Sequence, residues 1–317
     1  MQLYPISRKS ASVALLLLVA ILVASIVRYA LSPFEVEVAD SIYRERTITL
    51  VLAAMLAIYG GVIEGKMLPR SGLSKGYCTL PLPLYGLLSC GIFFAPDAIE
   101  TIFVSVSLAL SLYLLLRSLH SAGEKDSVFF ASILLGLTML VNPSCVVLAG
   151  VIPLSIFILA LSLRQTFLMV LGYVLPFAAA SYAMWYGGGE LWDFGRNVVE
   201  ALSRERLMVV EQIPYVGLLM VLYVAIVLLG GMVYMALRPD KMFLLSRVRR
   251  ALSLFVSVLF LTLSMLFLPS TDLSVFAVVA VPTTILLSMV LSFVPINFST
   301  IVYWVLLLLF VLHLFVA

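Results

Sequence analysis

Charged residues are scarce in this sequence. Asp, Glu, Lys and Arg make up 11% of its 317 residues, and hydrophobic residues make up 63%. A typical soluble domain has about 25% charged residues and about half apolar ones. So much apolar surface cannot be buried inside one soluble core, which excludes a soluble globular protein. The sequence also has no basic stripe of the kind that follows a phosphate backbone, so we expect no nucleic-acid partner.

Cysteine and histidine are rare as well. The three cysteines, Cys78, Cys90 and Cys145, are far apart and form no CxxC pair. This spacing argues against a disulfide framework and against a cysteine zinc site. The two histidines, His120 and His313, are too few and too separated for a His-rich metal site.

Long apolar runs are what the sequence has in abundance. A hydrocarbon core of ~30 Å is crossed by about 20 apolar residues in a helix, and a backbone in lipid must satisfy its own hydrogen bonds. We therefore predict an all-α fold, a polytopic membrane bundle of about 11 transmembrane helices in a single domain over residues 1–317. The predicted helices lie at 11–31, 47–63, 79–95, 99–117, 128–142, 145–163, 166–185, 214–236, 251–268, 274–293 and 299–317.

The Asn142-Pro143 pair separates two short apolar runs. It leaves two alternatives open: a tight outward turn between two spans, or a break inside one longer hairpin. An even number of spans would place the basic cluster at 247–250 outside, so we retain the odd number.

Basic residues predict the orientation. The first run follows Arg8 and Lys9, but it is too long for a signal peptide, so we interpret it as a retained helix. With the N-terminus inside, the cytoplasmic segments hold 13 of the 19 basic residues and 4 of the 16 acidic ones, as the positive-inside rule requires. We expect a multi-pass protein of the cell (inner) membrane with a cytoplasmic N-terminus.

The centres of the predicted spans have no Asp, Glu, Lys or Arg. Arg28, Glu64, Glu100 and Arg117 are all placed at the ends of spans by this prediction. Ionisable residues inside the membrane are typical of proton relays and ion-coupled transporters. Their absence argues against a pump or an ion-driven symporter.

Chemistry is therefore sought at the outer surface. The first outer segment, residues 32–46, contains Glu37, Asp40, Arg44 and Arg46, and the second contains Asp97. Carboxylates there could hold a divalent metal or act as a general base, and arginines could hold a lipid phosphate as a bidentate fork. The alternative is that these charges only keep the ends of the helices solvated.

The longest outer segment, 186–213, has an amphipathic pattern. Its charged residues are three or four apart, and its apolar residues follow the same spacing on another face, which predicts an amphipathic helix lying in the outer interface. This helix is either a lid over a site or a long connector. The residues of the pattern are Glu190, Asp193, Arg196, Glu200 and Arg204 on one face and Leu191, Phe194, Val198 and Leu202 on the other.

Three short motifs resemble a multi-pass membrane family of unknown function that is common in Bacteroidota. They are the run Phe129–Leu137, the Asn142-Pro143 pair and the run Leu171–Pro176. The general layout of apolar runs matches that family over most of the chain.

A more distant resemblance is to polyprenyl-phosphate-dependent membrane glycosyltransferases, through the many helices and the acidic first outer segment. In that family an Asp of the first outer loop is the catalytic base, and Asp40, followed by Ser41-Ile42-Tyr43, is the matching position. The hypothesis of a lipid-linked sugar transferase makes Asp40 and Asp97 the catalytic residues, with Asp40 as the base and Asp97 or Glu37 assisting it through a divalent metal. It also implies that Arg44 or Arg46 holds the phosphate of a polyprenyl-phosphate-linked sugar.

Three functions remain open at this stage. The first is a glycosyltransferase-like protein that acts on lipid-linked sugars at the outer face. The second is a non-enzymatic scaffold or assembly partner. The third is a transporter of a lipid or small molecule, for which Pro282, Thr283 and Thr284 would border the path.

Overall fold

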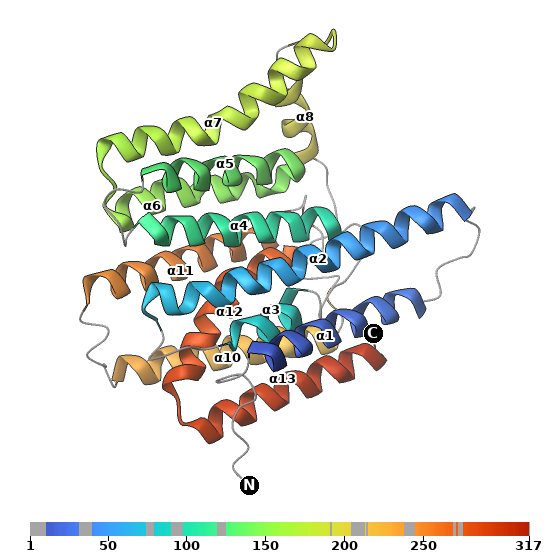
Figure 1. The fold of residues 1–317 in the computed structure, drawn as a ribbon, viewed down its shortest axis with the longest axis vertical. Coiled ribbons are helices and arrows are strands. Elements are labelled where there is room, and N and C mark those ends of the chain that lie inside the picture. The colour runs from blue at the N-terminus through green and yellow to red at the C-terminus, as the bar shows by residue number, and fades with distance from the viewer. Residues whose placement is uncertain are drawn as a thin grey trace.

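A computed structural model describes residues 11–31, 40–73, 79–89, 98–118, 125–190, 192–203, 213, 215–237, 245–268, 271 and 275–316. These residues form helices joined by turns, and none of them is in a β-strand (Figure 1). The all-α prediction is confirmed.

The helical elements coincide with the predicted apolar runs, although several ends differ. Two 3₁₀ segments, η1 and η3, continue or join the α-helices. The elements are α1 (Ala11–Leu31), α2 (Asp40–Ser71), α3 (Pro81–Ser89), α4 (Ala98–Ser118), α5 (Lys125–Val141), η1 (Pro143–Gly150), α6 (Val151–Leu159), α7 (Leu163–Tyr186), α8 (Asp193–Leu202), α10 (Tyr215–Leu237), α11 (Ser246–Ser264), η3 (Met265–Phe267), α12 (Phe276–Phe293) and α13 (Ile296–Val316).

Several of these helices can cross a bilayer. Within the described residues, seven are long and apolar enough: Val51–Ser71, Ile99–Ser118, Leu163–Tyr186, Tyr215–Leu237, Ser246–Phe267, Phe276–Phe293 and Asn297–Phe315. The apolar stretches in α1, α5 and η1–α6 are shorter. These helices are typical of a multi-pass membrane protein. Seven spans are supported directly, and the predicted number of eleven is not confirmed.

The centre of the bundle is formed by α3 and α12. All nine residues of α3 are buried, and α12 is buried along most of its length. Helix α12 contacts α3, α4, α10 and α11, and α3 also contacts α1 and α2. On the other side of α4, the layers continue through α5 to α7 at the edge (Figure 1).

The Asn142-Pro143 pair forms a tight turn. The Asn142 side-chain oxygen accepts a hydrogen bond from the Ser144 N–H at 3.0 Å, which caps η1. The chain then doubles back, and η1 packs on α5 (Figure 1). Of the two alternatives left by the sequence, the structure has the turn between two helices.

The two apolar motifs of the resemblance pack against each other. A Cβ atom added to Gly172 in α7 would lie 2.3 Å from Ser132 Oγ and 2.7 Å from the Phe129 carbonyl oxygen in α5. A Cβ on Gly136 in α5 would lie 2.7 Å from the Tyr173 carbonyl oxygen. Small residues let membrane helices approach this closely. These motifs are thus explained by helix packing.

Basic side chains tie helices together at one end of the bundle. Arg70, near the end of α2, donates a hydrogen bond from Nη1 to the Tyr113 hydroxyl of α4 at 2.5 Å. Its guanidinium carbon is 5.0 Å from the centre of the Tyr113 ring. Arg250, early in α11, donates to the Leu159 carbonyl at the end of α6 at 3.3 Å. A cation suits the Leu159 carbonyl, because it lies at the C-terminal end of α6.

Candidate functional site

The predicted outer site is described only in part. Asp40 is the first residue of α2, and Arg44 and Arg46 lie in its first two turns. The sequence predicts a loop as far as Arg46, so this part of the prediction is wrong, because polar residues continue the helix beyond its apolar run. Glu37 and Asp97 lie outside the described residues.

The geometry of α2 places Asp40 far from the apolar part of the helix. The 32 residues of α2 correspond to a length of about 48 Å, and Asp40 lies about 16 Å along the axis from Val51, where the apolar span begins. No three His, Cys, Asp or Glu residues in the described part of the chain are arranged to hold a metal ion. The roles given to Asp40, Asp97, Glu37, Arg44 and Arg46 stay predictions.

The amphipathic helix predicted within 186–213 is described in part, because Leu191 and residues 204–212 lie outside the described residues. Helix α7 continues to Tyr186, the turn at 187–189 follows, and α8 covers only Asp193–Leu202. Val198 is buried, and α8 packs on α7 and η1. Trp185, Tyr186 and Trp192 are exposed, as expected for side chains at a membrane surface.

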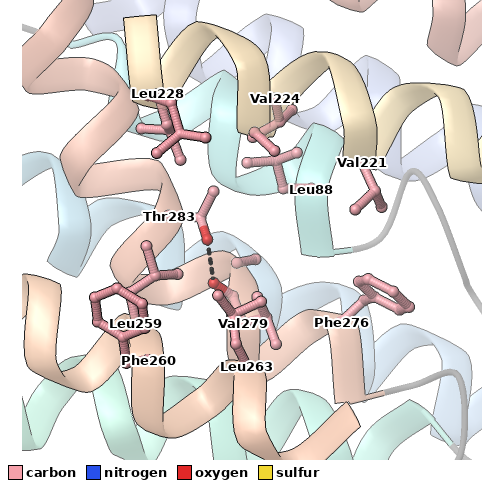
Figure 2. Close-up of a pocket in the computed structure, with 13 residues that line it drawn as sticks. Leu88, Val221, Val224, Leu228, Leu259, Phe260, Leu263, Phe276, Val279 and Thr283 are labelled. Atoms are coloured by element: carbon pink, nitrogen blue, oxygen red, sulfur yellow. Dashed lines mark hydrogen bonds between the residues drawn. The ribbon is translucent and has the colours of Figure 1, made fainter. Parts of the chain in front are cut away.

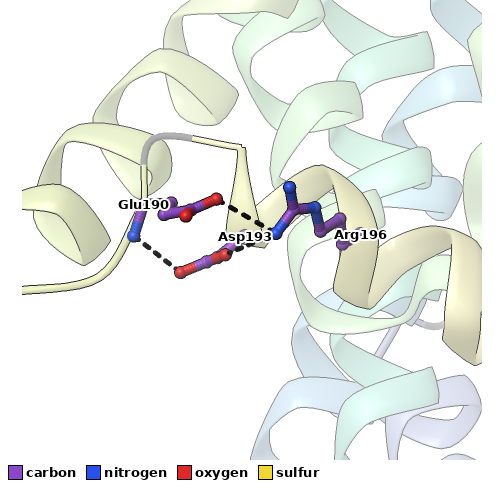
Figure 3. A network of polar contacts seen from close by, with 3 residues as sticks. All are labelled: Glu190, Asp193 and Arg196. Atoms are coloured by element: carbon purple, nitrogen blue, oxygen red, sulfur yellow. Dashed lines mark hydrogen bonds and ion pairs between the residues drawn. The ribbon is translucent and has the colours of Figure 1, made fainter.

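The charged residues of this segment stabilise the start of α8. The Glu190 N–H donates to Asp193 Oδ2 at 2.7 Å, and Arg196 Nη1 is 3.0 Å from Glu190 Oε2 and 3.7 Å from Asp193 Oδ1 (Figure 3). The Arg196 and Glu190 side chains are 69% and 68% exposed. Exposed ion pairs contribute about 0–1 kcal/mol. This cluster is a structural feature of the turn, with no cavity beside it among those described.

An apolar groove opens between the helices of the C-terminal half. It has a volume of about 240 Å³ and is lined by α3, α10, α11 and α12. Val221, Val224 and Leu228 of α10 face residues of α11 and α12 across it (Figure 2). Phe260 and Leu229 on its rim are both 69% exposed, so the groove is open at the side of the bundle.

The lining of the groove is almost free of hydrogen-bonding groups. Its one polar side chain among those described is Thr283. The Thr283 hydroxyl donates to the Val279 carbonyl of its own helix at 2.7 Å (Figure 2). Neighbouring Pro282 lies inside α12, which remains helical through it. The groove therefore offers an occupant apolar contact and little else.

A glutamate is buried inside α2. The sequence predicts Glu64 in a cytoplasmic segment just after a span, but α2 continues to Ser71 and places it within the span Val51–Ser71. Its relative exposure is 0%. Neither carboxyl oxygen has a hydrogen-bond partner among the described residues. The prediction that span centres lack acidic residues is therefore wrong at this position.

Small residues allow the close packing around Glu64. A Cβ on Gly60, one turn before Glu64 on the same face, would be 2.9 Å from the Tyr85 hydroxyl oxygen. A Cβ on Gly65 would be 2.5 Å from Leu82 Cδ1. The turn of α2 that carries Glu64 is therefore pressed against the first two turns of α3.

A chain of hydrogen bonds crosses the bundle beside this contact. The Tyr85 and Ser105 hydroxyl oxygens are 2.8 Å apart, and Ser105 donates to the Ala277 carbonyl at 2.7 Å. All three helices α3, α4 and α12 are joined by this chain. Its hydroxyl groups are buried, so it fixes their relative positions in a region without water.

The first turn of α3 gives the Glu64 carboxyl no backbone donor. Pro81 and Pro83 have no N–H, the Leu82 N–H donates to Thr79, and the Leu84 N–H donates to Leu80. A helix N-terminus usually offers free N–H groups to an anion. Here those groups are absent or used, which is why a carboxylate packed on this turn finds no partner.

A signal for Glu64 exists in the sequence. Ala53, Ala57, Gly60, Glu64 and Leu68 are three or four residues apart, the spacing of one helix face. Extending the helix by this periodicity, rather than ending it at the first charge, would have placed Glu64 among small buried residues.

Comparison of the chain with models of protein families, with curated proteins and with solved structures finds no match.

Proposed function

We propose that this chain is a membrane transporter that binds the apolar tail of a lipid in the groove of α3, α10, α11 and α12. The strongest support is the groove itself. It is almost wholly apolar, and it opens at the side of a bundle whose helices α10, α11 and α12 are long enough to cross a bilayer. An occupant at that depth comes from the hydrocarbon region, where lipid tails are the abundant apolar molecules.

The size of the groove fits a part of a lipid. Pockets that enclose a whole drug-sized ligand have about 300–1,000 Å³, and this groove has about 240 Å³. A section of a tail fills it, while the headgroup lies elsewhere. Transport is also favoured by Glu64, because an ionisable residue inside the membrane is typical of ion-coupled carriers.

The topology that we propose has eleven crossings with the N-terminus in the cytoplasm of a bacterial inner membrane. It is supported by the coincidence of helical elements with the predicted runs. It is also supported by the basic residues Arg70, Arg164 and Arg250, which lie at the ends of helices that share one side of the bundle (Figure 1).

Filling the groove should prevent lipid binding. Ala225 lines the groove on α10, while its neighbour Ile226 is 60% exposed and does not line it. In nanodiscs that contain a photoactivatable lipid, Ala225→Trp should reduce cross-linking to α10–α12 about tenfold, which corresponds to about 1.4 kcal/mol. Ile226→Trp should leave cross-linking unchanged. Equal labelling of the two variants would contradict lipid binding in the groove.

A second candidate is transfer of a sugar from a polyprenyl-phosphate donor at the outer face. It is favoured because the apolar lining of the same groove suits a section of a polyprenyl chain, and because α2 carries Asp40, Arg44 and Arg46 beyond its apolar span. If it is correct, Asp40→Asn should lower turnover about 10²–10⁴-fold, as for a lost general base. Asp193→Asn, in the exposed ion pair, is the control. Unchanged turnover in Asp40→Asn would exclude Asp40 as the base.

A scaffold without transport or catalysis is the remaining alternative. It predicts that neither Ala225→Trp nor Asp40→Asn changes the function of the protein in cells.

A further inference from the structure

In the described spans, Glu64 is the one buried side chain with two polar atoms that both lack a hydrogen-bond partner. Its carboxyl is fully buried and without a hydrogen bond, and no described pocket reaches it. Removing a carboxylate anion from water costs several kcal/mol unless a partner compensates. The cost falls when a proton neutralises the group.

Among the described residues, no cation forms an ion pair with Glu64 in place of that proton. The elements that contact α2 are α1, α3, α4, α11 and α12. Helix α12 has no titratable residue, and α3 has only Tyr85. The titratable or charged residues of the others are Arg28 and Tyr29 of α1, Glu100, Tyr113 and Arg117 of α4, and Arg247, Arg249 and Arg250 of α11.

These charges lie toward the ends of the bundle. Arg70 and Tyr113 bind each other, about 9 Å beyond Glu64 along α2. The first turn of α11 is level with Gly72, because a Cβ there would lie 3.2 Å from Val248, and Gly72 is about 12 Å beyond Glu64. On α2 itself, Tyr59 and Lys66 are exposed, whereas Gly60 and Glu64 are buried.

Close to Glu64, α2 and α3 are held in contact by small residues of α2. Gly60 and Gly65 bring α2 against Tyr85 and Leu82 of α3. Thr79, just before α3, has a buried hydroxyl that also lacks a partner.

We propose that Glu64 is a proton-binding site inside the membrane. In the arrangement seen here one carboxyl oxygen carries a proton. When α2 and α3 move apart and water enters, the O–H bond breaks, the proton passes to water and the carboxylate remains. Closure requires the carboxylate to take a proton back from water, and no other bond changes. This goes beyond lipid binding and would link the movement of the helices to protons.

Infrared difference spectroscopy of the full chain in nanodiscs tests the proposal without a lipid substrate. Besides the bands of solvated carboxyls, spectra recorded at acidic and at alkaline pH should differ by the carbonyl band of a protonated carboxylic acid without a hydrogen bond, which lies at a higher frequency. The band should be lost in Glu64→Gln and kept in Glu100→Gln, because Glu100 is exposed in the first turn of α4. Identical difference spectra for the wild type and Glu64→Gln would overturn the proposal.

A second variant covers the case in which Glu64→Gln does not fold. Glu64→Asp keeps a carboxyl group and shortens the side chain by one methylene, so the band should persist at a shifted frequency. An unshifted band would assign the signal to another residue and overturn the proposal. Because the readout is the proton, a failure of lipid binding at the groove leaves this test unaffected.

Discussion

Replacing Glu64 with methionine should make the folded protein more stable. The carboxyl is fully buried, and both of its oxygens lack partners in the described part of the chain. A buried polar group without a hydrogen bond costs about 1–3 kcal/mol. Methionine has a similar length, has no polar hydrogen, and adapts to irregular packing. We expect Glu64→Met to raise the free energy of unfolding by about 1–3 kcal/mol.

The measurement is thermal unfolding of the purified protein in detergent, followed by circular dichroism. Glu100→Met is the control, because an exposed position should change stability by less than about 0.5 kcal/mol. A clear loss of stability in Glu64→Met would contradict the account, since it would mean that the carboxyl makes a favourable interaction. A gain in stability together with lost function would show that Glu64 is retained for function at a cost to the fold.

Gly172→Leu should be the most destabilising single substitution in the α5–α7 contact. A side chain there meets the Phe129 carbonyl oxygen at 2.7 Å and Ser132 Oγ at 2.3 Å already at the Cβ position. Backbone cannot give way as the end of a side chain can, so the two helices must separate. Overpacking typically costs about 1–3 kcal/mol, and we expect this case at about 3 kcal/mol.

Gly230 provides the matched control for this substitution. It lies in the apolar helix α10, and a Cβ there has no atom within 4 Å. Gly230→Leu should be neutral or stabilising by about 0.5–1 kcal/mol, because glycine is a poor helix former. Equal unfolding temperatures for Gly172→Leu and Gly230→Leu would show that α5 and α7 are not in contact as described.

The helices of this chain follow from hydropathy, but their ends do not. The predicted run at 11–31 is helical throughout in α1, because lipid forces an apolar stretch to bond its own backbone. The run at 47–63 gives only the middle of α2, which is 32 residues long. Polar residues do not end a helix by themselves. The charged residues Arg46 and Glu64, which flank the apolar run, therefore do not mark the two ends of α2.

The candidate site was less predictable than the fold. Glu64 is adjacent to an apolar run, and only the packing of α3 on α2 shows that it is buried. The groove is formed by α3, α10, α11 and α12, which come from distant parts of the chain. No local pattern encodes such a cavity. By contrast, the Asn142-Pro143 turn depends on neighbouring residues, and the sequence named it as one of two alternatives.

The most direct test of the account measures lipid movement across a bilayer. Vesicles with the purified protein and a fluorescent lipid in one leaflet would be compared with protein-free vesicles, with and without a pH difference. The account predicts faster movement with the wild type and with Ile226→Trp, and the protein-free rate with Ala225→Trp. If the wild-type protein moves lipid no faster than protein-free vesicles do, the chain is not a lipid transporter.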